Sequence, residues 1–323
     1  MIGFLFRRLL QAIIVIFFVS LVVFFLAQLV PGGEARAVLQ TRATRALIAK
    51  FNRQNGLDLP IWDQLFRYFK GLIWPIWHPK FDLGYSYKYN QQVNSLIAER
   101  LPRTLLLVGF STIISLIIAI PLGIIQVVRR NTFVDYTLTG LSFIFYAMPA
   151  FLLGTLLIVY FALDNKIFPV SAPGTGSAWQ IVTDPRAFVL PVITLCALTI
   201  ASFSRYMRSS MMDALAEDYV RTARAKGASN RRVLYGHALR NALIPILTLI
   251  GLSLPAIVSG ALITENVFNY PGMGLLTVQA AENVDIPLVL GTTLVITIAT
   301  VAGSLLADVL YAIADPRIRF GGE

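Results

Sequence analysis

Few side chains in this sequence are of the types that do covalent chemistry. Its 323 residues include two histidines and one cysteine. His78 and His237 lie far apart and form no HExxH pair, the arrangement that holds catalytic zinc on one helix face. No lysine is followed by serine or threonine, so the chain has no Walker A loop for ATP. This inventory argues against an enzyme and predicts no catalytic residue, metal site or cofactor.

The side chains best able to make specific polar contacts gather between Glu217 and Asn241, in EDYVRTARAKGASNRRVLYGHALRN. Good helix formers fill the first ten positions, Gly227 is typical of a helix stop, and Ser229 can cap a second helix. On the first helix Val220, Ala223 and Gly227 fall at i, i+3 and i+7 and form a narrow stripe of small residues. Charged residues ring that stripe: Arg221, Arg224 and Lys226.

A helix of this kind could lie on anionic lipid headgroups and need no partner. Lipid-facing helices, however, bury bulky Trp, Phe or Leu, whereas this stripe consists of Val, Ala and Gly. We therefore expect it to form a contact with a groove on another protein.

The elements around this stretch are predicted to be membrane helices. Hydrophobic residues make up 56% of the chain and charged residues 14%, against about a quarter charged in soluble domains. The first apolar run follows Arg7 and Arg8 as in a signal peptide, but it is longer than a signal core of about 7–15 residues. Six segments are long and apolar enough to cross a bilayer: Leu9–Val30, Thr104–Val128, Tyr136–Leu163, Phe188–Ser204, Ala242–Thr264 and Ile286–Ala307.

The positive charges predict how these spans are oriented. The loop Asp164–Ala187 holds only Lys166 and Arg186, and Glu265–Asp285 holds neither Lys nor Arg. Because positive charge in short loops marks the cytoplasmic face, both termini and the charged stretch are predicted inside, in a cell membrane. The net charge of +10 is then partly topology, which argues against nucleic-acid binding. The basic residues of the predicted inner set are Arg7, Arg8, Arg129, Arg130, Arg205, Arg208, Arg221, Arg224, Lys226, Arg231, Arg232, Arg240, Arg317 and Arg319.

The segment Pro31–Arg103 is predicted to lie outside, because long loops are translocated largely regardless of charge. Two amphipathic helices are expected in it. One has Val38, Leu39, Leu47 and Phe51 at roughly helical spacing and ends at Asn55-Gly56, and the other has Ile61, Leu65, Phe69 and Leu72 on a single face. They could rest on the membrane or on the helix bundle, or they could contact an external partner.

The predicted spans contain almost no ionisable residue, although ion-coupled transporters usually place such residues near the bilayer midplane. Energy for any transport would then come from a partner. The lone Cys196 lies inside a span and is predicted to be a small core residue. Prolines and small residues within the spans are mostly explained by packing, but some could line a pathway: Ser253, Ser259, Gly260 and Asn266.

The stretch DYVRTARAKGASNRRVLYGHALRNALIPI resembles the cytoplasmic signature of binding-protein-dependent ABC transporter permeases of the dipeptide, oligopeptide and nickel group. Three further segments agree: DLGYSYKYNQQVNSLIAERLPRTLLL, ENVFNYPGMGLLTVQAA and DVLYAIADPRIRF. The general signature has Glu-Ala-Ala, three residues, then Gly. Here Arg221-Thr222-Ala223 precedes Gly227, so a role of the signature glutamate is not carried over to Arg221.

The resemblance implies an all-α fold with six membrane helices, the type I ABC importer permease fold. It also implies a complex of this chain with a second, related permease, two cytoplasmic ATPases that bind ATP and Mg²⁺, and an external substrate-binding protein. Peptide is the favoured cargo. The alternative cargo is nickel or another small solute. The alternative to an ABC permease is a self-sufficient secondary transporter or channel.

This resemblance divides the chain into four parts: residues 1–30 as the first membrane helix, 31–103 as the external segment, 104–311 as the permease core with its cytoplasmic loop 205–241, and 312–323 as a cytoplasmic tail. It places the ATPase-docking helix at Tyr219, Val220, Arg221, Ala223, Arg224, Lys226, Gly227 and Arg231.

Overall fold

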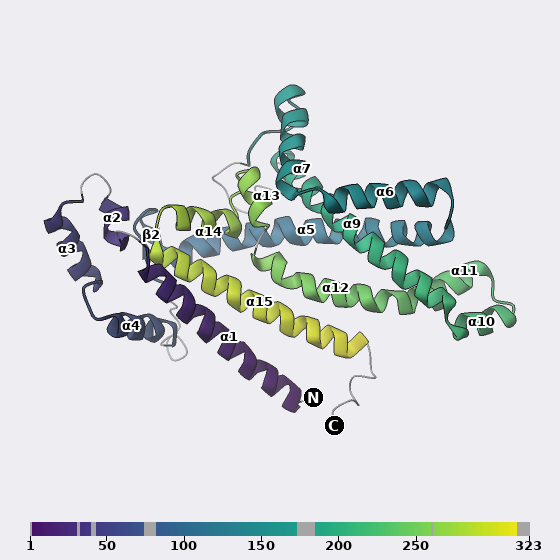
Figure 1. The fold of residues 1–323 in the computed structure, drawn as a ribbon, viewed down its shortest axis with the longest axis horizontal. Coiled ribbons are helices and arrows are strands. Elements are labelled where there is room, and N and C mark those ends of the chain that lie inside the picture. Colours follow the sequence, from purple (N-terminus) through teal and green to yellow (C-terminus); the bar gives the residue numbers. More distant parts are fainter. Residues whose placement is uncertain are drawn as a thin grey trace.

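The computed structural model describes residues 2–30, 33–39, 43–73, 82–172, 185–259 and 261–314. Nearly all of them are helical, and the long helices run side by side in an elongated bundle (Figure 1). The long elements are α1 (Ile2–Gln28), α5 (Val93–Val128), α9 (Arg186–Ala216), α12 (Leu239–Ser259) and α15 (Ile286–Ala314). A single short hairpin within the described ranges pairs β1 (Tyr85–Ser86) with β2 (Gln91–Gln92) in antiparallel register.

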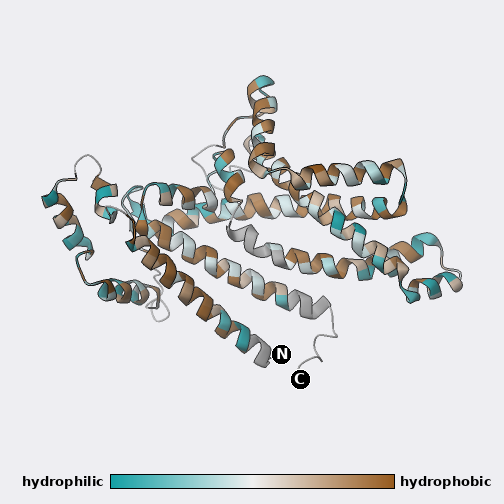
Figure 2. Ribbon diagram, viewed as in Figure 1, coloured by the Kyte–Doolittle hydropathy of each residue, from teal (hydrophilic) through white to brown (hydrophobic). Residues whose placement is uncertain are grey.

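Within the described ranges, five helices are long and apolar enough to cross a membrane, and a bent helix pair would make a sixth span. The five are Phe6–Gln28, Val93–Val128, Arg186–Ala216, Asn230–Gly251 and Ile286–Asp308. Apolar residues cover them along most of their length, whereas hydrophilic residues gather at the two ends of the bundle (Figure 2). The fourth span is longer than predicted and continues past Ser204 to Ala216. The fifth begins before Ala242, and α12 ends at Ser259, ahead of the predicted end at Thr264.

The predicted third span, Tyr136–Leu163, is not one straight helix. It consists of α6 (Phe133–Ala147) and α7 (Ala150–Leu157), which continues as the π-helix η3 (Ile158–Asp164). The two halves are bent by 102°. Pro149 explains the break, because a residue before proline is forced out of the helical region, and Met148 has an extended ψ of 125°.

Small residues let the long helices approach closely. A Cβ added at Gly123 of α5 would lie 2.6 Å from the Met207 Cβ of α9, and one at Gly251 of α12 would lie 2.7 Å from the Ala307 Cβ of α15. These glycines are therefore contact points between helix backbones, as is common in membrane bundles. Cys196 is buried in the core between α5 and α9, as predicted.

Two ends of the bundle carry the polar elements. At one end lie α10 (Asp218–Ala225), α11 (Asn230–Arg232) and the turn between α5 and α6 (Figure 1). The start of α1 and the end of α15 point the same way, and Arg8 forms a 3.1 Å ion pair with Asp308. At the other end lie α2 (Gly33–Leu39), α3 (Arg45–Asn55), α4 (Ile61–Ile73) and α14 (Met273–Glu282), and α13 (Leu262–Val267) lies between α14 and α7 (Figure 1).

The predicted helix that ends at Asn55-Gly56 is confirmed as α3, and the second predicted helix is confirmed as α4. The pattern before Asn55 is not one helix, because α3 begins only after Thr44, and Val38 and Leu39 lie in the separate helix α2. Thr44 caps the start of α3, and Gly56 ends it in the left-handed conformation at φ 67°. On α4 the predicted face is half-buried, whereas Trp62 and Phe66 on the other side are 68% and 69% exposed.

Candidate functional site

The charged stretch forms a helix, a tight turn and a second helix at one end of the bundle. α9 ends at Ala216, and Glu217 takes an extended conformation that starts α10 in a new direction. After α10 the chain turns at Gly227, and Ser229 caps α11 by accepting a hydrogen bond from the Arg232 N–H. From α11 the chain runs through the π-helix η4 (Val233–Ala238) directly into α12. Both ends of this stretch are therefore continuous with long membrane helices.

Gly227 makes the turn possible, as its position in the sequence predicts. Its φ of +80° lies in the left-handed region, which residues with a side chain adopt at a cost. The Ala228 N–H bonds to the Ala223 carbonyl, and the Gly227 N–H bonds to the Arg224 carbonyl, which is the Schellman pattern. No atom lies within 4 Å of a Cβ added at Gly227, so a side chain there would meet backbone strain but no steric clash.

The stripe of small residues does not face outward as predicted. Val220 is 0% exposed and Ala223 8% exposed, because both pack against Val233 of η4 within the same chain. This small core holds α10 against the start of the next helix. The face that remains for a partner is the charged one, with Gly227 at its end.

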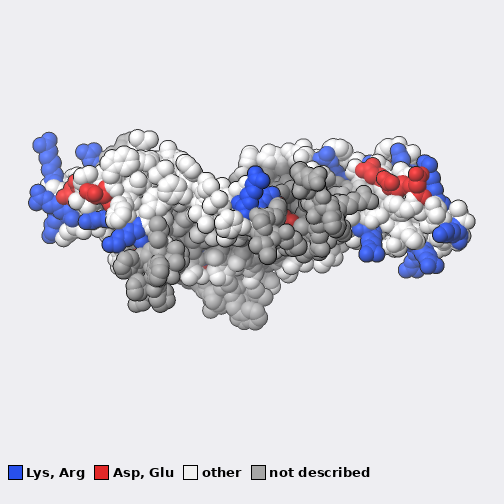
Figure 3. All heavy atoms as spheres, turned by 90° about the horizontal axis from the view of Figure 1, so that it is seen from below, with Lys and Arg blue, Asp and Glu red and all other residues white. Residues whose placement is uncertain are grey.

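Six of the predicted docking residues lie on this exposed face: Tyr219, Arg221, Arg224, Lys226, Gly227 and Arg231. Lys and Arg side chains cover that end of the molecule in Figure 3, beside a smaller group of acidic side chains. Arg221 pairs with Asp218 at 3.2 Å, but both side chains are mostly exposed, so the pair stabilises the helix little. The basic groups are thus free to reorient toward a partner surface.

An ion pair braces the helix that leads into this site. Arg208 of α9 donates two hydrogen bonds to the Asp135 carboxylate of α6, at 3.2 and 3.1 Å, and Asp135 is 1% exposed. Thr139 and the Asn131 N–H also donate to this carboxylate. The brace joins α9 to the start of α6 eight residues before α9 ends at Ala216. Sequence reasoning placed Asp135 before a span and Arg208 in a loop, so it missed their pairing.

A second polar cluster, also missed, lies toward the opposite end of the molecule. The Glu265 carboxylate, with the residue 0% exposed, accepts hydrogen bonds from Thr104 Oγ1 at 2.8 Å and from the Leu275 N–H at 3.1 Å. Thr104 Oγ1 in turn accepts from the Met273 N–H, and the Tyr270 hydroxyl donates to the Arg103 carbonyl. The segment ENVFNYPGMG is thereby locked to the start of the membrane part of α5. The signal in the sequence for this polar cluster was the carboxylate of Glu265 inside an otherwise apolar segment.

The predicted pathway residues do not form one cluster that the structure describes. Ser253 donates to the Ile250 carbonyl and Asn266 to the Leu262 carbonyl, so each bonds within its own helix. Ser259 ends α12, and Gly260 lies outside the described residues. Their role in a pathway stays a prediction.

Candidate ligands for a metal are equally scarce in the described ranges. No group of three or more His, Cys, Asp or Glu side chains comes together there. His237 lies exposed in η4, and His78 is outside the described residues. The structure thus shows an exposed basic turn and polar locks between helices.

Comparison with known families agrees with this arrangement. Residues 119–320 match the family described as binding-protein-dependent transport system inner membrane component, and residues 1–108 match the corresponding N-terminal family. Because the first match covers more than half of the chain, the protein belongs to this family of transporter membrane subunits. Its members are membrane components of transport systems, which fits the apolar helices of the bundle.

Several curated proteins are similar over almost their full length. The oligopeptide transport system permease protein AppB of Bacillus subtilis is 34% identical over 99% of this chain and 100% of its own. A putative peptide permease protein of Brucella suis is 38% identical over 97% and 98%. The glutathione transport system permease protein GsiC of Escherichia coli K12 is 35% identical over 99% and 100%.

Proposed function

We propose that this chain is a membrane permease subunit of an ATP-driven ABC importer for peptides. The family match supports the transporter class, and the names of the similar proteins, which specify oligopeptide, peptide and glutathione transport, support the cargo. Nickel and other small solutes are the competing cargoes. In this proposal a second, related permease completes the pathway, and an external binding protein delivers the peptide.

The observation that carries the mechanism is the exposed basic turn between α9 and α12. It is the place where an ATPase can contact the permease and move two membrane helices at once, since the chain enters it from α9 and leaves it into α12. The ATPases would bind ATP and Mg²⁺. This chain would then convert their movement into a rearrangement of its helices.

The distribution of charge supports an orientation with this turn in the cytoplasm. Arg8, Arg129 and Arg130 belong to the same end of the bundle, whereas the loop around α14 carries neither Lys nor Arg. By the positive-inside rule, both termini are cytoplasmic, and α2, α3 and α4 lie on the external side. There they are placed to meet a binding protein.

The test is reconstitution of the complex in vesicles. The affinity-tagged chain is coexpressed with its proposed partner permease, ATPases and binding protein. Uptake of labelled dipeptides, oligopeptides and Ni²⁺ into the vesicles is then measured with ATP inside or outside. We expect peptide uptake that requires the ATPases, the binding protein and ATP on the cytoplasmic side. A Walker A lysine substitution in the partner ATPase is the matched control. Uptake by the purified chain alone would overturn the proposal, and uptake of Ni²⁺ without peptide would overturn the cargo.

A further inference from the structure

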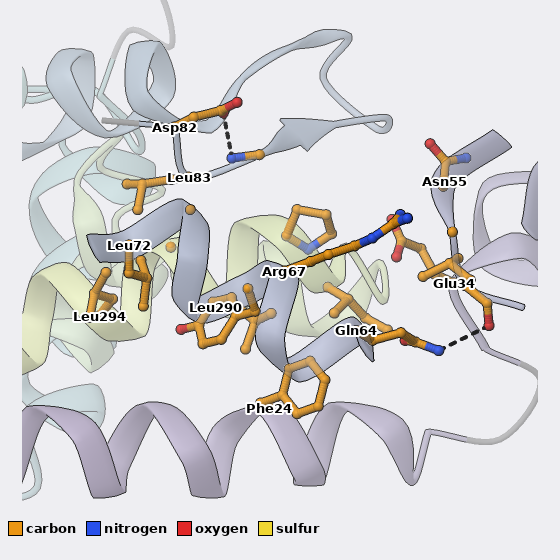
Figure 4. A pocket seen from close by; sticks show the side chains of 18 of the residues that line it. Phe24, Glu34, Asn55, Gln64, Arg67, Leu72, Asp82, Leu83, Leu290 and Leu294 are labelled. Atoms are coloured by element: carbon orange, nitrogen blue, oxygen red, sulfur yellow. Dashed lines mark hydrogen bonds between the residues drawn. The ribbon is translucent and has the colours of Figure 1, made fainter. Parts of the chain in front are cut away.

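A cavity of about 500 Å³ lies at the end of the bundle that carries the segment 33–73. Its walls come from α1, α2, the end of α3, α4, the loop Asp82–Gly84 before β1, and α15 (Figure 4). One part of the wall is polar and includes Glu34 and Arg67, and the other is apolar and includes Phe24, Leu290 and Leu294. Neither the exposed basic turn between α9 and α12 nor the polar locks described above contribute residues to the cavity wall.

Glu34 is the unusual member of the polar part. It is only 6% exposed, and the groups that shift its pKa include no hydrogen-bond donor and no cation. Burial, and secondarily the nearby Asp285 carboxyl, raise the pKa of Glu34 to about 7. A buried carboxylate is costly unless a cation or hydrogen-bond donors compensate it. The cavity therefore favours a ligand that brings a positive group to Glu34.

Arg67 adds the opposite charge. It extends from α4 across the cavity, toward the side on which Asn55 and Glu34 lie (Figure 4). Its guanidinium passes directly over Gly56, so a side chain at that position would displace the end of Arg67. A guanidinium is a strong partner for phosphate, to which it donates two parallel hydrogen bonds. The cavity thus presents one acidic and one basic group to the same ligand.

The apolar part reaches to the depth of the hydrocarbon core. Phe24 is in the last turns of the apolar stretch Phe6–Gln28, and Leu294 is eight positions into Ile286–Asp308, about 12 Å from its start at 1.5 Å per residue. Helix α4, which covers the cavity, has the exposed Trp62 and Phe66 that are typical of helices at a membrane surface. The polar groups thus lie near the membrane surface and the apolar wall below it.

We propose that this cavity binds one aminophospholipid, with its ammonium group at Glu34, its phosphate at Arg67 and part of an acyl chain along Phe24, Leu290 and Leu294. A peptide is also a zwitterion, but it has no long hydrocarbon chain to match a wall at this depth. Phosphatidylglycerol has the phosphate without the ammonium group, so it satisfies only Arg67. The inference uses the membrane placement of the helices and is independent of the cargo.

Lipid extracted from the purified complex tests the site directly. We expect mass spectrometry to find about one tightly held phosphatidylethanolamine per copy of this chain after other lipids have been washed away by detergent. Readdition to stripped complex of phosphatidylethanolamine, phosphatidylcholine or phosphatidylglycerol, followed by native mass spectrometry, then ranks their affinities. Because a charge-assisted contact contributes about 1.5–3 kcal/mol, we expect phosphatidylethanolamine to bind at least about tenfold more tightly than phosphatidylglycerol.

Three substitutions separate the parts of the site. Glu34→Gln should abolish the preference for the amine headgroup, and Arg67→Gln should weaken every phospholipid. In Gly71→Leu a side chain is added in α4 at the cavity wall, where an added Cβ would meet only the Asp82 carbonyl oxygen at 3.7 Å, so it should fill the cavity without a clash. The matched controls are Asp58→Asn and Arg53→Gln, which alter exposed charges near the cavity but outside its lining.

Equal retention of all three lipids by the natural chain would overturn the proposal. So would unchanged lipid content in Gly71→Leu, with the complex still assembled. Labelled peptide could instead bind to the stripped complex, compete with phosphatidylethanolamine and lose its binding in Gly71→Leu. In that case the cavity would be a peptide site and the assignment to lipid would be wrong. If the natural complex bound lipid as expected but did not transport peptide, that result would count against the proposed function alone.

Discussion

Thr104 and Glu265 are 161 positions apart in the sequence, yet the threonine hydroxyl donates a 2.8 Å hydrogen bond to the glutamate carboxylate inside the protein. The same hydroxyl oxygen accepts the Met273 N–H. One small side chain therefore joins α5 to both ends of the segment that connects α13 to α14.

Thr104→Val should consequently destabilise the protein more than its size suggests. Valine keeps the shape but leaves a buried carboxylate oxygen and a buried N–H without this partner, at a cost of about 2–4 kcal/mol. We expect the thermal midpoint in detergent to fall by several degrees. Thr112→Val is the control, because the Thr112 hydroxyl only bonds back to Val108 in its own helix. Equal effects of the two substitutions would show that the lock is unimportant.

The Asp135–Arg208 brace should behave as a coupled pair. Asp135→Asn leaves the Arg208 guanidinium without its counter-charge, and because Arg208 is 27% exposed we expect a loss of only about 1–3 kcal/mol. Arg208→Gln in the same chain should recover part of that loss. The measurement is a double-mutant cycle on thermal stability, with Arg221→Ala as an exposed control. Strict additivity of the two losses would contradict a direct interaction.

Gly227→Val should uncouple ATP hydrolysis from transport. Open space surrounds Gly227, so the strain comes from a β-branched residue at φ +80°, and the turn would open to relieve it. We expect weaker retention of the ATPases on tagged permease, or ATP hydrolysis without peptide uptake. Gly227→Asn is the matched control, because asparagine tolerates the left-handed region. Full retention and full uptake by the valine variant would remove the turn from the mechanism.

Glu34 should make the protein less stable as pH rises. Its pKa is about 7 in the folded chain against an ordinary 4.5, so between these values the folded state holds a proton that the unfolded state has lost. Folding is then favoured at low pH, and up to about 3 kcal/mol is lost as pH rises from about 4.5 through 7. Thermal midpoints of lipid-stripped protein should show this decline, and Glu34→Gln should flatten it. A decline that persists in the glutamine variant would assign it to other groups.

The proposed orientation can be tested by labelling. With Cys196 replaced by alanine, a cysteine at Glu282 should react with an impermeant thiol reagent in sealed cells, and one at Ser229 should react only after the membrane is opened. Both positions are exposed, so the readout is sidedness and not burial. The reverse pattern would place the basic turn outside.

Sequence alone predicted the class of fold, because long apolar runs and arginine-rich loops leave few other architectures. It also predicted local devices that depend on a single residue, such as the stop at Gly227 and the cap at Ser229. It failed where a neighbour decides the outcome. The hydropathy pattern does not reveal a bend at Met148-Pro149, since both halves of the span are apolar. The stripe of small residues that includes Val220 likewise gives no sign that Val233 covers it.

The polar locks were missed for the same reason. Glu265 and Thr104 become partners only after α5 and α13 pack, and nothing local in either segment specifies the other. Glu34 is comparable, because its burial depends on α2 lying close to residues near Asp285. Such contacts require the tertiary structure.

The packing of α1 against α15 has a consequence for synthesis. Of the described spans, α1 is synthesised before the others, yet its main helical neighbour is α15, which is synthesised after them. Arg8 can therefore pair with Asp308 only once α15 has been made. At about 5–20 residues per second, α1 waits for tens of seconds in the lipid before that partner emerges. During this interval the insertion machinery, or a membrane helix made before α15, must cover the face of α1 that α15 later contacts.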